Sequence, residues 1–168
     1  DVLGSRGLGD VYKRQDHQEG IEDKFNIASE IIQFIMKKAK VFANRLALNV
    51  TCLSNICNGN SVFEKQVMYV GPFYKNKTIK EWSSRTNARG MMSINGIEES
   101  LNIITEYTYA TEQTTKETRI ICHTDINTIP ENKDFRFESD SIAIFKKQAR
   151  SIFLEIQDDL EGLIQDEK

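Results

Sequence analysis

The sequence predicts an α+β domain in which an antiparallel sheet of about four to five strands is flanked by long amphipathic helices at its N- and C-terminal ends. Apolar residues recur at helical spacing over residues 21–46 and again over residues 142–163. Between these two stretches the chain is rich in β-branched and aromatic residues, and Asn-Gly pairs mark turns.

Composition excludes several classes of protein. The chain has 168 residues, of which 39% are hydrophobic and 28% charged, as in a single ordinary globular domain. Its net charge of −3 is too acidic for a protein that coats nucleic acid. The most apolar run, 31–36, contains Gln33 and ends at Lys37, whereas a membrane span needs about 18 apolar residues. We therefore expect neither nucleic-acid binding nor a membrane span.

The first 20 residues are expected to form a disordered or artefactual leader, with a single α+β domain over residues 21–166. The leader shows no apolar period of either a helix or a strand. Its glycines lack the spacing of a dinucleotide-binding loop, and no apolar strand precedes them. The stretch 2–15, VLGSRGLGDVYKRQ, resembles translated sequencing-adapter read-through, which predicts that the natural chain continues upstream.

A long amphipathic helix is predicted over residues 21–46, because apolar side chains recur there in alternating steps of four and three. This stripe is expected to pack on the sheet or on a partner helix. Its heptad-like spacing also suits a parallel dimer contact, so both interpretations stay open. The stripe consists of Ile21, Phe25, Ala28, Ile32, Ile35, Ala39, Phe42 and Leu46.

A hairpin and a short helix are predicted next. Residues 49–57 and 61–74 have high β propensity and are separated by an Asn-Gly-Asn turn, which indicates two paired strands. Thr78 and Glu81 then have the spacing of a capping box. We therefore expect a helix over residues 79–89.

Further strands are predicted in the second half of the chain. Residues 91–94 form a short apolar stretch before an Asn-Gly turn. Residues 101–109 alternate with a period of two, and their Thr, Tyr and Ile content favours a strand over a helix at 97–108. Residues 118–126 are expected to form a strand that pairs antiparallel with it.

The closing helix is predicted to begin at Ser139 or Asp140, either of which can cap it. Apolar residues follow in steps of three and four, so that the helix has one apolar stripe. This stripe consists of Ile142, Phe145, Ala149, Ile152, Ile156, Leu160 and Leu163.

The three cysteines favour a reducing, cytoplasmic compartment, because Cys52, Cys57 and Cys122 form an odd set without paired spacing. With His123 they are numerous enough for a structural zinc, but Cys122 and His123 are adjacent on a strand and should point to opposite faces. Nucleophilic catalysis by Cys122 or His123 lacks an identifiable orienting acid. We expect buried apolar cysteines, no metal, no cofactor and no enzymatic activity.

A basic segment over residues 75–89 carries five basic side chains against one acid, Glu81. Such a segment would hold a small anionic ligand or a docking peptide, and its alternative interpretation is a solvated charged face. Trp82 is either a core residue or a stacking platform. The candidate ligand-binding residues are Lys80, Trp82, Arg85, Arg89 and Tyr107.

The order of elements, together with the run FRFESDSIAIF at 135–145, resembles that of GAF-like and PAS-like sensory domains, in which an aromatic strand end and an acidic cap lead into a heptad-like closing helix. The resemblance implies a non-catalytic regulatory module that senses a small ligand, dimerises through its terminal helices, or does both. The chromophore cysteine and the Asn-Lys-x-Phe-Asp-Glu run of some GAF domains have no counterpart here. The alternative is a structural or protein-interaction domain without a small-molecule ligand.

Overall fold

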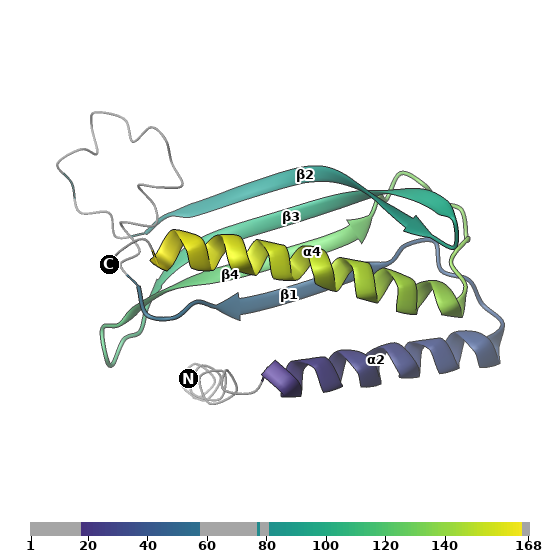
Figure 1. The fold of residues 1–168 in the computed structure, drawn as a ribbon, viewed down its shortest axis with the longest axis horizontal. Coiled ribbons are helices and arrows are strands. Elements are labelled where there is room, and N and C mark those ends of the chain that lie inside the picture. Colours follow the sequence, from purple (N-terminus) through teal and green to yellow (C-terminus); the bar gives the residue numbers. More distant parts are fainter. Residues whose placement is uncertain (1–17, 58–76, 78–80, 166–168) are drawn as a thin grey trace, which may run out of the picture.

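The computed structural model describes residues 18–57, 77 and 81–165 of the chain. These residues form a four-stranded antiparallel sheet, in the order β1-β4-β3-β2, and two helices (Figure 1). The elements are α2 (Gln18–Ala39), β1 (Ala47–Leu53), β2 (Ser83–Ile94), β3 (Ile97–Thr111), β4 (Thr118–Thr128) and α4 (Ser139–Gln165). The predicted α+β class and antiparallel sheet are confirmed.

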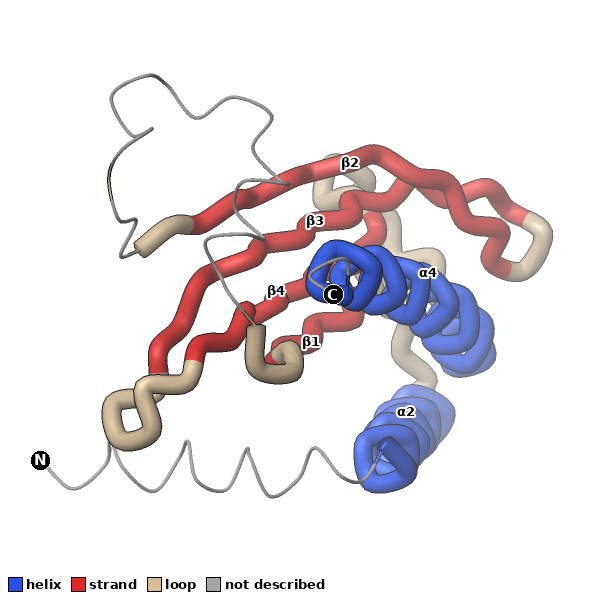
Figure 2. Tube along the Cα trace, turned by 60° about the vertical axis from the view of Figure 1, so that its left-hand side comes forward, coloured by secondary structure: helices blue, strands red, loops and turns tan. Residues whose placement is uncertain are grey.

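The two helices have different positions relative to the sheet. α4 crosses one face of the sheet, whereas α2 runs beside α4 towards the β1 side (Figures 1 and 2). The prediction that both helices flank the sheet is therefore wrong, because α4 fills the helix-covered face and α2 packs mainly on α4.

The main core lies between α4 and the sheet. Leu101 and Ile126, on the central strands, are fully buried, and Phe145 and Ala149 of α4 pack in the same cluster. Ile142 and Leu160 of α4 are also buried. The predicted stripe of the closing helix thus faces the core, except that the side chain of Leu163 lies outside the described part of the chain.

A second apolar cluster lies towards the C-terminal end of α4. We call it the thiol cluster, since it contains all three cysteines of the chain. Its buried members are Cys57, Trp82, Ile120, Cys122 and Leu160, and Cys52, Tyr107, Tyr109, Ile156 and Ile164 pack against them.

The prediction of a helix over residues 79–89 is wrong. Residues 83–94 form the long strand β2, which pairs with β3 along its whole length, and Arg85 lies opposite Glu106. Pairing with a neighbouring strand outweighs the local helix signal here. The short strand expected at 91–94 is the last part of β2, and Asn95 and Gly96 form the predicted turn with positive φ angles of 53° and 78°.

The first helix ends earlier than the apolar stripe predicted. α2 stops at Ala39 rather than at residue 46, and Lys40 adopts a left-handed φ of 52°. The amide of Val41 donates to the carbonyl of Met36 at 3.2 Å, which is the pattern of a Schellman C-cap. Phe42 and Leu46 therefore lie beyond the helix, in the segment that leads to β1.

The other predictions concern three strands and the start of the closing helix. The strands expected at 101–109 and 118–126 are confirmed as β3 and β4, and they pair antiparallel. Strand 61–74 of the expected hairpin lies outside the described residues, and within the described part of the chain β1 pairs with β4. α4 begins at Ser139, so Ser139 and Asp140 lie in its first turn rather than before it.

Candidate functional site

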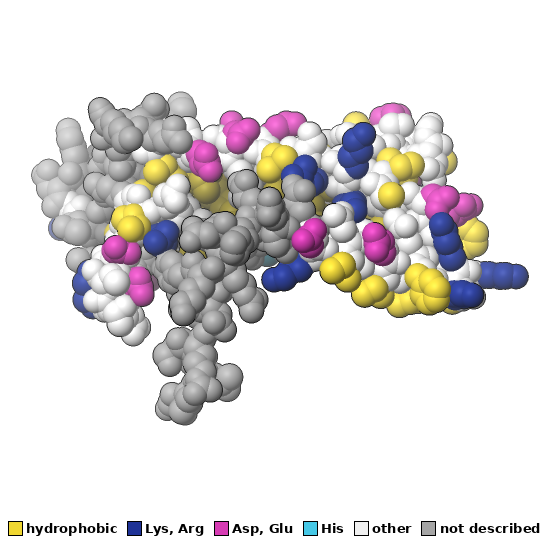
Figure 3. Space-filling model, turned by 60° about the horizontal axis from the view of Figure 1, so that its bottom comes forward, with side chains coloured by type: hydrophobic (Ala, Val, Ile, Leu, Met, Phe, Trp, Pro, Cys, Tyr) yellow, Lys and Arg dark blue, Asp and Glu magenta, His cyan; other side chains and the backbone are white. Residues whose placement is uncertain are grey.

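The outer side of α2 exposes several large apolar side chains. Four large side chains there are more than half exposed: Ile27 at 56%, Ile31 at 54%, Phe34 at 62% and Ile35 at 54%. We call these four residues the α2 apolar face. Their spacing places them on one side of the helix, and Figure 3 shows hydrophobic side chains gathered along the α2 edge of the molecule.

α2 is attached to the molecule through its other side. Over residues 23–39, where the side chains of α2 are described, Ser29 and Met36 are buried, and Met36 belongs to the main core. The ammonium of Lys146 on α4 donates to Asn26 Oδ1 at 2.8 Å and to Ser29 Oγ at 3.1 Å. α2 therefore contacts the rest of the molecule through a small, partly polar surface. Ile32 and Ile35, which belong to the predicted apolar stripe, are exposed to solvent.

Two basic residues lie near the C-terminal end of α2. Lys37 Nζ lies 3.1 Å from Asp140 Oδ1 in the first turn of α4, and this lysine lowers the pKa of the Asp140 carboxyl. The ammonium of Lys38 lies 5.7 Å from the centre of the Phe34 ring, within the range of a cation–π contact. Basic side chains therefore lie at the end of the α2 apolar face.

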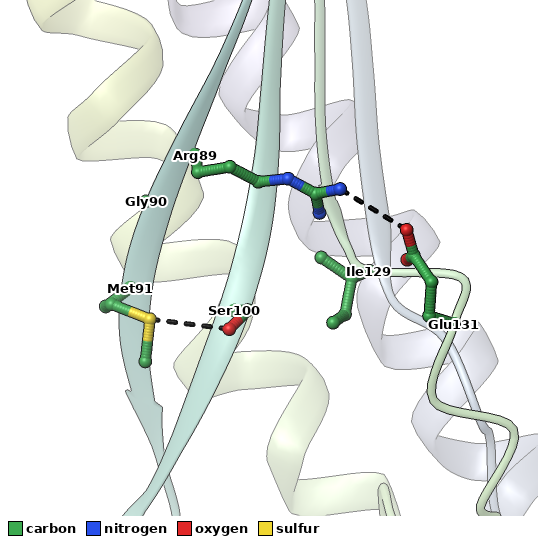
Figure 4. A pocket seen from close by; sticks show the side chains of 6 residues that line it. All are labelled: Arg89, Gly90, Met91, Ser100, Ile129 and Glu131. Atoms are coloured by element: carbon green, nitrogen blue, oxygen red, sulfur yellow. Dashed lines mark hydrogen bonds and ion pairs between the residues drawn. The ribbon is translucent and has the colours of Figure 1, made fainter.

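An open groove of about 390 Å³ lies beside β2 and contains one of the predicted ligand-binding residues (Figure 4). Arg89 Nη2 lies 3.3 Å from Glu131 Oε1 across it. The pKa of Glu131 is lowered, first by a hydrogen bond from its own backbone amide and then by Arg89. Since Glu131 matches the charge of Arg89, the groove offers no unmatched cation to an anionic ligand. It is lined by Arg89, Gly90, Met91, Ser100, Ile129 and Glu131.

The five predicted ligand-binding residues do not form one site. Lys80 lies outside the described residues. Trp82 and Tyr107 pack in the thiol cluster on the α4 side of the sheet. Arg85 and Arg89 are exposed, and strand alternation places them on the opposite face. The structure therefore brings the two aromatic residues together and separates them from the two arginines.

An ion pair that sequence reasoning missed joins three parts of the fold. The Arg136 guanidinium donates to both carboxylate oxygens of Glu99, at 2.7 and 2.6 Å, and to the carbonyl of Asn44 at 2.8 Å. Its hydrogen bonds to Glu99 raise the pKa of Arg136. The pair links β3 with the segments after α2 and before α4. No short motif signals it, because its members are far apart in the sequence.

The cysteines meet within the thiol cluster. Cys52 on β1 lies directly opposite Cys122 on β4, and the Cys52 thiol is 3.7 Å from the Cys122 carbonyl oxygen. The interaction between the two side chains lowers the pKa of Cys52 to about 7 and raises the pKa of Cys122, which burial raises further. Burial also raises the pKa of the neighbouring Tyr107 hydroxyl. Sequence spacing gave no sign of this pairing.

His123 lies apart from these thiols. It faces the other side of the sheet, where its Nδ1 is 2.9 Å from Thr51 Oγ1. Among the described residues no group of three His, Cys, Asp or Glu side chains is placed to hold a metal ion. Neither described helix is long and apolar enough to cross a membrane.

Comparisons with protein-family models, with curated proteins and with solved structures gave no match.

Proposed function

We propose that this chain is a non-catalytic regulatory module that associates with a second copy of itself through the α2 apolar face. The observation that supports the proposal is the exposure of Ile27, Ile31, Phe34 and Ile35 on one side of a helix that is already attached by its other side. Contiguous exposed apolar patches on a helix are typical of interaction surfaces. Covering such side chains is worth up to about 1.5–3 kcal/mol each.

The spacing along α2 favours another helix as the occupant. Ile27, Ile31 and Phe34 follow the four-then-three step of a coiled-coil seam. Glu30 and Lys37 border this seam on the same side, one heptad apart. In an antiparallel pair, Glu30 of each copy would lie near Lys37 of the partner subunit. That lysine, which already faces Asp140 of its own chain at 3.1 Å, would then have a second acid beside it. A symmetric pair therefore combines apolar burial with matched charges.

The wider class that we propose is a GAF-like or PAS-like sensory module. Its support is the four-stranded antiparallel sheet with a closing helix packed on one face. Association takes precedence over ligand sensing in this proposal, because the Arg89 groove is open and its charge is matched by Glu131. The three thiols fit a reducing compartment.

The test is the molar mass of the full chain, measured by light scattering after size exclusion at several concentrations. We expect a dimer for the wild type and a monomer for Ile31→Glu, since a buried glutamate on each copy would oppose pairing. Ile97→Glu is the matched control, because Ile97 is an isoleucine of 60% exposure on a different element. It should remain dimeric.

A monomeric wild type, or a dimeric Ile31→Glu, would overturn the proposal. The lysines near the apolar face also make an anionic lipid surface a competing partner. Sedimentation with phosphatidylserine vesicles separates the two. A monomer that binds these vesicles through Ile31 would replace self-association with membrane docking.

A further inference from the structure

We propose that Cys52 and Cys122 form an oxidisable dithiol that hydrogen peroxide converts into a reversible disulfide between β1 and β4. All three cysteines carry thiols in the structure. The proposal depends on how the sheet places two of them, and it is independent of association through α2.

The strand register places the two cysteines directly opposite each other. Cys52 and Cys122 are direct partners in the β1–β4 ladder. Along this ladder the Ser54 amide donates to the Ile120 carbonyl at 2.8 Å, and the Thr128 amide donates to the Leu46 carbonyl at 2.9 Å. Hydrogen-bonded pairs recur at every second position of an antiparallel ladder, and Cys52 and Cys122 lie an even number of positions from both of these bonds. They therefore form a hydrogen-bonded pair, for which the Cα separation is about 5.5 Å. That separation is also typical of disulfides.

The two thiols have unequal access to solvent. Cys122 is fully buried, whereas Cys52 is partly exposed. The neighbouring Cys122 and Gln157 side chains lower the pKa of Cys52, and so favour its thiolate. Cys52 is thus the sulfur that a small oxidant reaches first, and Cys122 is the sulfur that resolves the product.

The reaction balances as a two-electron exchange. The Cys52 thiolate attacks one peroxide oxygen, the O–O bond breaks, and a sulfenic acid and hydroxide form. Cys122 then attacks the Cys52 sulfur, so that the S–S bond forms and the S–O bond breaks. The departing hydroxide takes the Cys122 proton and becomes water. Both thiols are oxidised, and one peroxide is reduced to two waters once the first hydroxide is protonated.

Cys57 provides a matched control within the same cluster. Its sulfur lies 3.7 Å from Ser54 Oγ, and it has no cysteine opposite it in the strand register. Its exposure of 7% lies between that of the fully buried Cys122 and that of the partly exposed Cys52. A reaction that depends only on being a cysteine in this cluster would include Cys57, whereas a reaction that depends on the register would not.

The test counts thiols in the full chain after treatment with one equivalent of hydrogen peroxide and removal of the excess. We expect the three thiols of the wild type to fall to one, and dithiothreitol to restore all three. Non-reducing peptide mapping should find one linkage, between the peptides of Cys52 and Cys122. The oxidised protein should also melt several degrees higher, because the bond closes a long loop of the unfolded chain.

Single substitutions assign the roles of the three thiols. Cys57→Ala should still lose two thiols to the same linkage. Cys52→Ala should keep both of its thiols, and Cys122→Ser should stop at a sulfenic acid that dimedone labels. Retention of all three thiols in the wild type, a linkage through Cys57, or sulfonic acid at Cys52 without a disulfide would overturn the proposal. The wild-type peptide map decides the question even if Cys122→Ser does not fold.

Discussion

The two described helices have similar amphipathic sequences, yet they use their apolar sides in opposite ways. α4 buries Phe145 and the fully inaccessible Ala149 against the sheet. α2 instead contacts α4 through Ser29 and Met36, and exposes its larger apolar residues. The comparison teaches that an apolar stripe indicates a surface that needs cover, whereas the neighbouring elements decide whether the cover comes from the same chain.

The reason for the difference lies in where each helix is connected. α4 follows β4 through a segment held by Arg136, and Ala149 is small enough to let the helix approach the sheet closely. α2 ends at Ala39. The next residue, Lys40, is left-handed, and the segment that follows forms a β-bridge between Ala43 and Phe137. α4 occupies the helix-covered face, and α2 contacts that layer from its side (Figure 2).

Truncating an aromatic residue in each helix should give the largest contrast. Phe145→Ala should lower the free energy of unfolding by about 3–5 kcal/mol, because it leaves a cavity in the main core. Phe34→Ala removes a ring that is 62% exposed, and should change the unfolding free energy of the monomer by less than about 0.5 kcal/mol. Urea denaturation at a concentration below that of association measures both. A loss above about 2 kcal/mol in Phe34→Ala would mean that α2 packs by its apolar face after all.

Removing the ion pair between Arg136 and Glu99 should give the second largest loss of stability. Arg136→Met removes the partner of Glu99, whose side chain is 8% exposed, and frees the Asn44 carbonyl. We expect a loss of about 1–3 kcal/mol in unfolding free energy, the usual cost of a buried polar group left without its partner. Hydrogen exchange should show the loss in both the segment after α2 and the segment before α4. The double variant Glu99→Gln with Arg136→Met should recover part of it, since no buried charge is then left unpaired.

Sequence patterns predicted the elements that are specified by local signals. The stripe of α4, the alternation of β3 and the Asn95-Gly96 turn are local signals, and tertiary structure agreed with each of them. The helix expected at 79–89 failed because β2 derives its stability from pairing with β3, which no local window contains. The candidate site was predictable only in part for the same reason. Trp82 and Tyr107 meet through packing, and Arg136 meets Glu99 across 37 positions of the chain.

The smallest expected effect concerns the contact between the helices at the surface. Asp140→Asn removes the charge that faces Lys37 at 3.1 Å, in a pair whose side chains are 60% and 74% exposed. Exposed pairs of this kind contribute little to global stability, so the midpoint of urea unfolding should stay within experimental error. Amide hydrogen exchange in the last turn of α2 should become faster, because that turn is attached to α4 by this contact.

The pH dependence of this contact has a definite sign. Lys37 lowers the pKa of Asp140 in the folded protein, so the stabilisation is present above the carboxyl's unfolded pKa and is lost as pH falls through the lower, folded value. Wild-type exchange in the last turn of α2, corrected for the intrinsic pH dependence of exchange, should therefore approach that of Asp140→Asn in acid and differ from it at neutral pH. Equal exchange of the two proteins at neutral pH would show that α2 is held by Ser29, Met36 and Lys146 alone, and that the inner side of α2 is sufficient to keep its apolar face turned outward.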